Sequence, residues 1–556
     1  MTLAATSATT GAAQPVTAPG AVPTAPAGAA DLVQSVDWAA IAPPTIAAAV
    51  ALLVLVADLF VPVARKQLLG WTAIAGLGAA ILALVPLREG DRSTFCLTTD
   101  ADACSYTADH FALAIQFLVL GGALLTALLS LADTRGRTDA GDGTRTGPPA
   151  KTGPGARAGL AAKAGPSAEG ALPAGEFWFL LLSSAAGAAL LPASRDLATL
   201  VVALEVASLP AFALVGLKRG DRLSGEAALK FFLSSVTATA VTLLGVSFVY
   251  ASTGTLHLTE VAQALDDVPA PLETLAKAGV ALTLVGFAFK TAAAPFHFWV
   301  PDTYVGAPLP VAAYLSVVGK AVGFTGLILV TVVAFPTYAD VWGPALSVLA
   351  ALTMTVGNVA ALRQVPTRAW SAVRLLAWSS VAQAGYLLVP IAAAAYSGDD
   401  QIGATVAYAL MYAVVNLGAF AVAALVARRH PLNRISDYRG LYATRPAAAL
   451  VMAFFLLCLA GLPPGVIGLF AKVTVFSAAV DAGLGWLAVV MGVNVVIALY
   501  YYLKWTAVLF RTPEGTPGRH PVPAPVTAAV VLTAVAGVVL SGYPQLVLRF
   551  AADTLF

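Results

Sequence analysis

Four ionisable side chains interrupt long apolar stretches of this sequence: Glu205, Lys290, Lys320 and Lys472. The first three lie near the middle of their stretches, and Lys472 follows a Pro463-Pro464 pair by about two helical turns. A charge at the centre of a bilayer costs roughly 2.5–3.5 kcal/mol on insertion scales, so such residues usually line a path for ions or protons. Burial disfavours the charged form of a lysine or a glutamate, and a nearby opposite charge restores it. These four residues could therefore take up and release protons as their neighbours change charge.

Other charges within the apolar stretches have simpler explanations. Lys230 lies four residues after Glu226, a spacing that favours an ion pair on one helix face. Lys504 lies near a helix end, where its long side chain can reach the membrane surface. Asp58 lies near Arg65 and Lys66 and fits a structural role. We keep three residues as secondary candidates for proton transfer: Lys230, Lys504 and His297.

The elements that must position these residues are membrane-spanning helices. The 556-residue chain is 59% hydrophobic and 11% charged, with a mean hydropathy of +0.83. Soluble domains are about 25% charged, so the composition predicts an all-α polytopic membrane protein. Because 31 Lys and Arg are balanced by 29 Asp and Glu, a nucleic-acid-binding surface is not expected.

Apolar runs of roughly 20 residues, the length that crosses a bilayer as a helix, predict the number of spans. We identify fourteen: 43–63, 67–87, 111–132, 175–193, 196–217, 226–251, 274–297, 307–333, 341–362, 370–392, 402–427, 446–479, 483–510 and 523–548. The twelfth is too long for one straight span and contains Pro463 and Pro464, so it should be broken there.

The basic residues of the loops predict sidedness. The odd-numbered loops hold 21 Lys and Arg, whereas the even-numbered loops and the C-terminal tail hold five. Basic loops stay in the cytoplasm, so both termini should be extracytoplasmic. Residues 1–42 should form an extracytoplasmic disordered tail and helix lead-in, and the Gly-, Ala-, Pro- and Thr-rich residues 133–174 a flexible cytoplasmic linker. The remaining units are helices 1–3 (43–132), 4–8 (175–333), 9–13 (341–510) and 14 (523–548).

The three cysteines and five histidines indicate no cofactor site. Cys96 and Cys104 share one extracytoplasmic loop, where a disulfide could form, and Cys458 within a span is best explained as a buried inert thiol. The spacing matches neither an iron–sulfur motif nor a metal cluster, and no phosphate-binding loop is found. We therefore expect no cofactor in this chain.

Several motifs resemble the antiporter-like membrane subunits of respiratory complex I. The stretch 284–311, LVGFAFKTAAAPFHFWVPDTYVGAPLPV, is similar to the signature of that family. Two segments are more similar to the N-type subunit than to its sister subunits L and M. They are Tyr304–Pro308, within this stretch, and Ser316–Lys320, which follows it. Further similar motifs follow in the family's order: Leu204–Leu209, Leu375–Tyr386, Tyr412–Phe420, Asp437–Leu441, Leu459–Pro464 and Asn494–Tyr502. The resemblance covers roughly residues 43–510.

The resemblance implies a fourteen-helix antiporter-like fold with broken helices 7 and 12, the breaks falling at Pro295 and at Pro463 and Pro464. It implies a proton-translocating subunit of NADH–quinone oxidoreductase in the bacterial cell membrane, with Glu205, Lys290, Lys320 and Lys472 as its central ionisable residues. NADH, FMN, iron–sulfur clusters and quinone would belong to partner subunits. Those partners would include M- and L-type antiporter-like subunits and small membrane subunits, in the lipid bilayer and without nucleic acid.

Two departures from the family pattern and three rival functions remain. Trp378 stands where the family commonly has Tyr, and Gln383 where it often has His, which weakens a proton relay through the tenth helix. A subunit of a multi-subunit sodium/proton antiporter is the first rival, but Tyr304–Pro308 and Lys320 disfavour it. A solute transporter would need more polar side chains in the deep spans, and a purely structural anchor would not need four deep ionisable residues.

Overall fold

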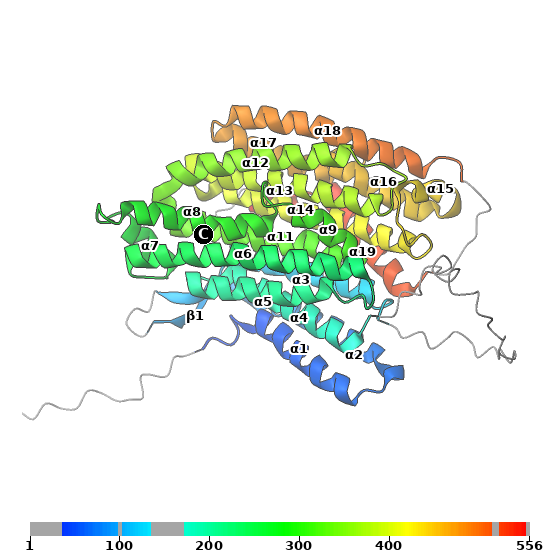
Figure 1. The fold of residues 1–556 in the computed structure, drawn as a ribbon, viewed down its shortest axis with the longest axis horizontal. Helices are drawn as coiled ribbons and strands as arrows, with labels where there is room; N and C mark the ends of the chain where they lie inside the picture. The colour runs from blue at the N-terminus through cyan, green and yellow to red at the C-terminus, as the bar shows by residue number, and fades with distance from the viewer. Residues whose placement is uncertain (1–35, 98–102, 135–171, 514–521, 552–556) are drawn as a thin grey trace, which may run out of the picture.

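The computed structural model describes residues 36–97, 103–134, 172–513 and 522–551. Within these residues, long apolar helices run side by side in one bundle, with α1 and α2 at one edge and α17 and α18 at the opposite edge (Figure 1). Most of the predicted N-terminal tail (1–42) and of the predicted linker (133–174) lies outside the described residues.

The first part of the bundle consists of four long helices and a small hairpin. The helices and helical turns are α1 (Ala42–Phe60), η1 (Val63–Arg65), α2 (Gln67–Leu82), η2 (Val85–Glu89), α3 (His110–Ser130), α4 (Ala174–Leu190) and η3 (Leu191–Ala193). Strands β1 (Arg92–Cys96) and β2 (Cys104–Ala108) pair antiparallel, with Arg92 opposite Ala108 and Cys96 opposite Cys104. Cys96 and Cys104 form a disulfide, which the sequence left open.

The middle part carries two of the three deep lysines. Its elements are α5 (Leu197–Val215), α6 (Arg222–Thr253), α7 (Leu258–Leu265), α8 (Glu273–Thr291), α9 (Trp299–Gly306), α10 (Leu309–Tyr314), η4 (Leu315–Gly319), α11 (Lys320–Ile328), η5 (Leu329–Ala334) and η6 (Pro336–Tyr338). Segments η4 and η5 are π-helical, so the eighth predicted span is not one regular α-helix. π-Helical turns hold one residue more than α-helical turns and are frequent at functional sites.

The last part carries the third deep lysine. Its elements are α12 (Ala339–Leu362), α13 (Ser371–Ser397), η7 (Asp399–Gln401), α14 (Ile402–Ala427), η8 (Ile435–Tyr438), α15 (Leu441–Thr444), α16 (Pro446–Ala460), α17 (Val466–Asp481), α18 (Gly485–Leu509), α19 (Ala524–Gly542), α20 (Gln545–Leu548) and η9 (Arg549–Ala551). Of the long helices, α13 is the most buried, and α1 and α19 are among the least.

The predicted spans agree with the observed helices. In the described residues, 13 helices are long and apolar enough to cross a membrane. The remaining predicted span, the twelfth (446–479), is the pair α16 and α17, which is divided as expected, at Pro463 and Pro464. Carboxylates begin three of the helices: Asp109, Asp196 and Asp221 accept hydrogen bonds from the backbone of α3, α5 and α6. Such caps satisfy donors that have no partner within the helix.

Both broken spans end their first helix on a left-handed residue. After α8, Ala292 has φ +66°, and a cis Ala294–Pro295 bond follows before α9 begins. After α16, Gly461 has φ +85°, and a cis Pro463–Pro464 bond precedes α17. Irregular backbone at membrane depth is tolerated where it is buried in protein or lines a polar cavity. The two breaks therefore lie where functional side chains are expected.

Candidate functional site

Lys290 lies in the last turn of α8 and is 5% exposed. Its Nζ donates a hydrogen bond to the Ser235 hydroxyl of α6 at 2.7 Å. The same nitrogen lies 4.9 Å from the ring centre of Phe212 and 5.5 Å from that of Phe231. The negative faces of aromatic rings attract a cation. One hydroxyl and two rings therefore support the ammonium group of Lys290.

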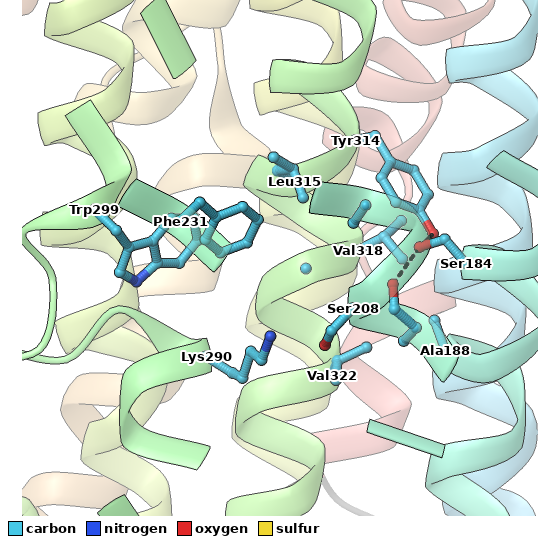
Figure 2. Close-up of a pocket in the computed structure, with 13 residues that line it drawn as sticks. Ser184, Ala188, Ser208, Phe231, Lys290, Trp299, Tyr314, Leu315, Val318 and Val322 are labelled. Atoms are coloured by element: carbon cyan, nitrogen blue, oxygen red, sulfur yellow. Dashed lines mark hydrogen bonds between the residues drawn. The ribbon is translucent and has the colours of Figure 1, made fainter. Parts of the chain in front are cut away.

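The Lys290 amine points into a small cavity (Figure 2). Apolar side chains form most of its wall, and Ser184, Ser208 and Tyr314 add hydroxyl groups. The Tyr314 hydroxyl donates to Ser184 at 2.9 Å. The cavity leaves about 20 Å³ to the centres of water molecules, which is room for at least one. Water in this cavity would lie beside the amine and within reach of hydroxyl groups.

Glu205 of α5 is half-buried and joins the same region through α6. Its Oε1 accepts a hydrogen bond from Thr239 at 2.6 Å. Thr239 lies four residues after Ser235, so the two hydroxyls share one face of α6. One hydroxyl binds Glu205 and the other binds Lys290. Our sequence analysis missed both residues, although two hydroxyls four positions apart in an apolar helix are a recognisable signal.

Lys320 is 1% exposed and comes directly after the π-helical turn η4. Its Nζ donates to the backbone carbonyl of Ser380 in α13 at 2.6 Å. The Ser380 hydroxyl accepts a hydrogen bond from Tyr412 of α14 at 2.9 Å. The environment of Lys320 therefore differs from that of Lys290, because its contact is a carbonyl rather than a hydroxyl.

Lys472 of α17 is 5% exposed and faces the end of α16. Its Nζ donates to the carbonyls of Leu459 and Ala460 at 3.0 and 2.8 Å. Carbonyls in the last turn of a helix carry partial negative charge and stabilise a cation. A Cβ on Gly461 would lie 3.2 Å from the Lys472 side chain, so glycine there also leaves room for the lysine.

A second small cavity lies beside Lys472. Gln383, Tyr408 and Tyr412 line it together with Cys458 and apolar residues. It also leaves about 20 Å³ to water centres. Gln383 accepts a hydrogen bond from Tyr408 and donates to the Tyr502 hydroxyl at 3.5 Å. At the position where the family often has His, Gln383 therefore places a buried amide that has its own hydrogen bonds.

The three deep lysines share one electrostatic feature. In the part of the chain that the structure describes, no carboxylate lies within the 4.0 Å of an ion pair from Lys290, Lys320 or Lys472. A buried charge without an opposite charge is costly, and losing the proton removes that cost. The arrangement thus suits groups that change their protonation.

The secondary candidates lie in more ordinary surroundings. Lys230 is exposed and forms ion pairs with Glu226 at 2.8 Å, as its spacing predicted, and with Asp302 at 3.0 Å. Lys504 is exposed and lies 5.7 Å from the ring centre of Tyr500. His297 is half-buried beside Trp378, with ring centres 5.6 Å apart. Asp58 pairs with Lys66 at 2.9 Å, which fits the predicted structural role.

The described residues contain no group of three His, Cys, Asp or Glu side chains placed to hold a metal ion. The two lysine cavities are also far too small for a quinone ring or a nucleotide. The residues at the site fit protons and water, and we assign no redox step to them.

Comparison with known proteins agrees with this chemistry. A family model described as NADH:quinone oxidoreductase/Mrp antiporter matches residues 194–498. A relative from Streptomyces griseus, named NADH-quinone oxidoreductase subunit N 2, is 73% identical over 545 residues, which cover 95% of this chain and 96% of the relative. A protein from Salinispora tropica, named NADH-quinone oxidoreductase subunit N, is 44% identical over 491 residues and 86% of each chain.

Two solved structures share the fold. A chain of respiratory complex I from Thermus thermophilus is 31% identical, with a TM-score of 0.69 over 92% of this chain and 100% of that chain. A chain of the Mrp complex from a Dietzia species has a TM-score of 0.74 over 92% of this chain and 96% of that chain. Because it is only 22% identical, its likeness shows the fold alone.

Proposed function

This chain belongs to the subunit N family of NADH-quinone oxidoreductase, and from that premise we propose that it moves protons along Glu205, Lys290, Lys320 and Lys472. It is a proton-translocating membrane subunit of that complex, and no redox centre is indicated in the chain itself. The four residues divide between two units, with Glu205, Lys290 and Lys320 in 175–333 and Lys472 in 341–510.

The observation that carries the proposal is the burial of three lysines without a carboxylate partner among the described residues. Such an ammonium group responds strongly to any charge that approaches or leaves, because little water screens it. A change of charge at one of the four residues Glu205, Lys290, Lys320 and Lys472 therefore changes the proton affinity of the next residue in that order. Glu205 and Lys290 each bind one hydroxyl of α6, Thr239 and Ser235 respectively, and these two hydroxyls lie four residues apart on the same helix.

The energy for this movement comes, in our proposal, from electron transfer in other subunits. In this proposal NADH, FMN, iron–sulfur clusters and quinone belong to those partners, and the two small lysine cavities serve water and protons. Moving one elementary charge against 100 mV requires about 2.3 kcal/mol. The partners that we propose are the M- and L-type antiporter-like subunits and the small membrane subunits of the same complex.

We also propose that both termini lie outside the cytoplasm of a bacterial cell. The distribution of Lys and Arg among the loops supports this orientation. The Cys96–Cys104 disulfide supports it as well, since the hairpin would then lie in the oxidising compartment.

The test replaces Lys290 with alanine in the whole complex, reconstituted in proteoliposomes. We expect quinone-coupled proton pumping to fall at least about tenfold, because a positioned acid–base group contributes ~10²-fold or more to proton transfer. Lys277→Ala is the matched control, since Lys277 lies on the same helix but is exposed and paired with Glu273 at 2.6 Å. Unchanged pumping in Lys290→Ala would remove the role that we assign to this lysine.

Measurements on the same proteoliposomes distinguish quinone-coupled proton pumping from sodium/proton antiport. If transport followed sodium and continued without quinone reduction, the chain would work as a sodium/proton antiporter subunit instead. We expect pumping to depend on NADH and quinone and to persist when potassium replaces sodium.

A further inference from the structure

The amines of Lys320 and Lys472 both donate hydrogen bonds to backbone carbonyls. These contacts stabilise the protonated amine but cannot transfer its proton further. The hydrogen-bond acceptor for Lys320 is the Ser380 carbonyl, and those for Lys472 are the carbonyls of Leu459 and Ala460. A backbone carbonyl accepts a hydrogen bond but has no proton of its own to release. A proton that travels between the two lysines therefore needs another group.

Ser380 and Tyr412 lie between the two sites. The carbonyl of Ser380 binds Lys320, and its hydroxyl accepts a hydrogen bond from Tyr412 at 2.9 Å. Tyr412 also lines the cavity of Lys472. Ser380 is fully buried and Tyr412 is 6% exposed, so bulk water does not bridge the two sites. Tyr412 thus donates a hydrogen bond to the residue that binds Lys320, and it also forms part of the wall of the Lys472 cavity.

Gln383 lines the same cavity but cannot serve in the same way. A side-chain amide does not titrate, whereas a hydroxyl can accept one proton as it releases another. Both ends of the amide are also engaged, with Tyr408 as donor and the Tyr502 hydroxyl as acceptor. These bonds suit Gln383 to fixing the shape of the cavity.

We propose that Tyr412, acting with Ser380 and cavity water, carries protons between Lys320 and Lys472, and that Gln383 only positions the cavity wall. The proposal rests on the proposed function. In one direction, a water in the cavity takes a proton from the Lys472 ammonium and gives one to the Tyr412 oxygen. Tyr412 passes its own proton to Ser380, and the Ser380 hydroxyl releases a proton toward a neutral Lys320 amine. Each hydroxyl ends with one proton, and the net change is one proton moved between the lysines.

The test compares two variants that lose the same atom. Tyr412→Phe removes the hydroxyl and keeps the ring, and we expect quinone-coupled proton pumping by the reconstituted complex to fall about tenfold. Tyr438→Phe is the control, because the Tyr438 hydroxyl is also buried and hydrogen-bonded, to Asn433 at 2.7 Å, but Tyr438 belongs to the turn η8 and lines neither lysine cavity. We expect this control to pump normally. The amount of complex recovered in mild detergent reports assembly for both.

A rescue variant distinguishes proton transfer from a structural role. In the Tyr412→Phe chain, Gln383→His places an imidazole in the same cavity, and imidazole can bind and release a proton near neutral pH. We expect it to raise pumping about threefold or more above Tyr412→Phe alone. Failure of this rescue in a complex that assembles normally would overturn the proposal.

The outcomes also separate this inference from the function on which it rests. If Lys290→Ala stops pumping but Tyr412→Phe pumps like Tyr438→Phe, the link through Tyr412 is wrong and the proposed function stands. If Lys290→Ala and Tyr412→Phe both pump normally, the proposed function fails as well.

Discussion

Gly286 of α8 sets how closely the Lys290 helix approaches α6. A Cβ at this position would lie 2.1 Å from the Thr242 hydroxyl oxygen, 3.1 Å from the Thr242 Cβ and 3.3 Å from the Ala238 carbonyl oxygen. Ordinary van der Waals contact begins at 3.4 Å, so the Cβ of Gly286→Ala would lie 1.3 Å too close to the Thr242 hydroxyl oxygen. Rotation of Thr242 is hindered because its side chain is β-branched and its oxygen accepts a hydrogen bond from the Gly286 N–H at 2.9 Å. We therefore expect α8 to move away from α6.

The effect on the site follows from the distance to Lys290, which lies one turn further along α8. Its Nζ is 2.7 Å from the Ser235 hydroxyl of α6, and a shift of 1.3 Å would take the two atoms to 4.0 Å. A hydrogen bond does not survive at that distance. Loss of a hydrogen bond to a charged group costs about 1.5–3 kcal/mol, which corresponds to a rate change of roughly 10- to 100-fold.

The assay is proton pumping by the whole complex in proteoliposomes. Gly225→Ala is the matched control, because Gly225 lies in α6 with nothing within 4 Å of the added Cβ. We expect Gly225→Ala to pump normally and Gly286→Ala to pump about tenfold more slowly or worse. Adding Thr242→Ala removes the nearest atom and should restore much of the rate. Equal pumping by the two glycine variants would refute the argument that helix spacing positions Lys290.

Two further predictions concern the hairpin of β1 and β2. Cys96→Ser with Cys104→Ser opens a loop with a sequence separation of 8, which should lower the local stability by about 2.5 kcal/mol and speed amide exchange in the strands by roughly 70-fold; unchanged exchange would mean that the strands hold without the disulfide. Burial raises the pKa of Tyr106 to about 12, against the lowering influence of Gln116 and Arg195. The folded state then holds this proton more tightly than the unfolded chain does, so the contribution of Tyr106 to stability is full below pH ~10 and is lost as the pH rises through about 12. The difference in tyrosinate absorbance between the parent and Tyr106→Phe should have its midpoint near 12, and a midpoint near 10 would contradict the burial.

The helices and the deep charges were predictable from sequence because the bilayer constrains both. A span must be long and apolar, and a charge inside it stands out against that background. Glu205, Lys290, Lys320 and Lys472 were found by this contrast, as was the break at Pro463 and Pro464.

The partners of those charges were not predictable in the same way. Ser380 contributes a backbone carbonyl to Lys320, and any residue type could supply that atom. Ser235 and Thr239 are common helix residues whose role depends on how α6 faces α5 and α8. The hairpin was missed because its strands are five residues each and lie between much stronger apolar signals. Side-chain pairing across helices depends on packing angles that periodicity does not contain.

The π-helical turn η4 has a consequence for how relatives are compared. A π-helical turn holds one residue more than an α-helical turn, so a chain can lose a residue there and close up as regular α-helix. The number of residues between Tyr304 and Lys320 is therefore not a fixed property of the fold, although both side chains are buried here. An alignment that forbids a one-residue gap across Leu315–Gly319 would pair Lys320 with the wrong position in a relative whose helix is regular.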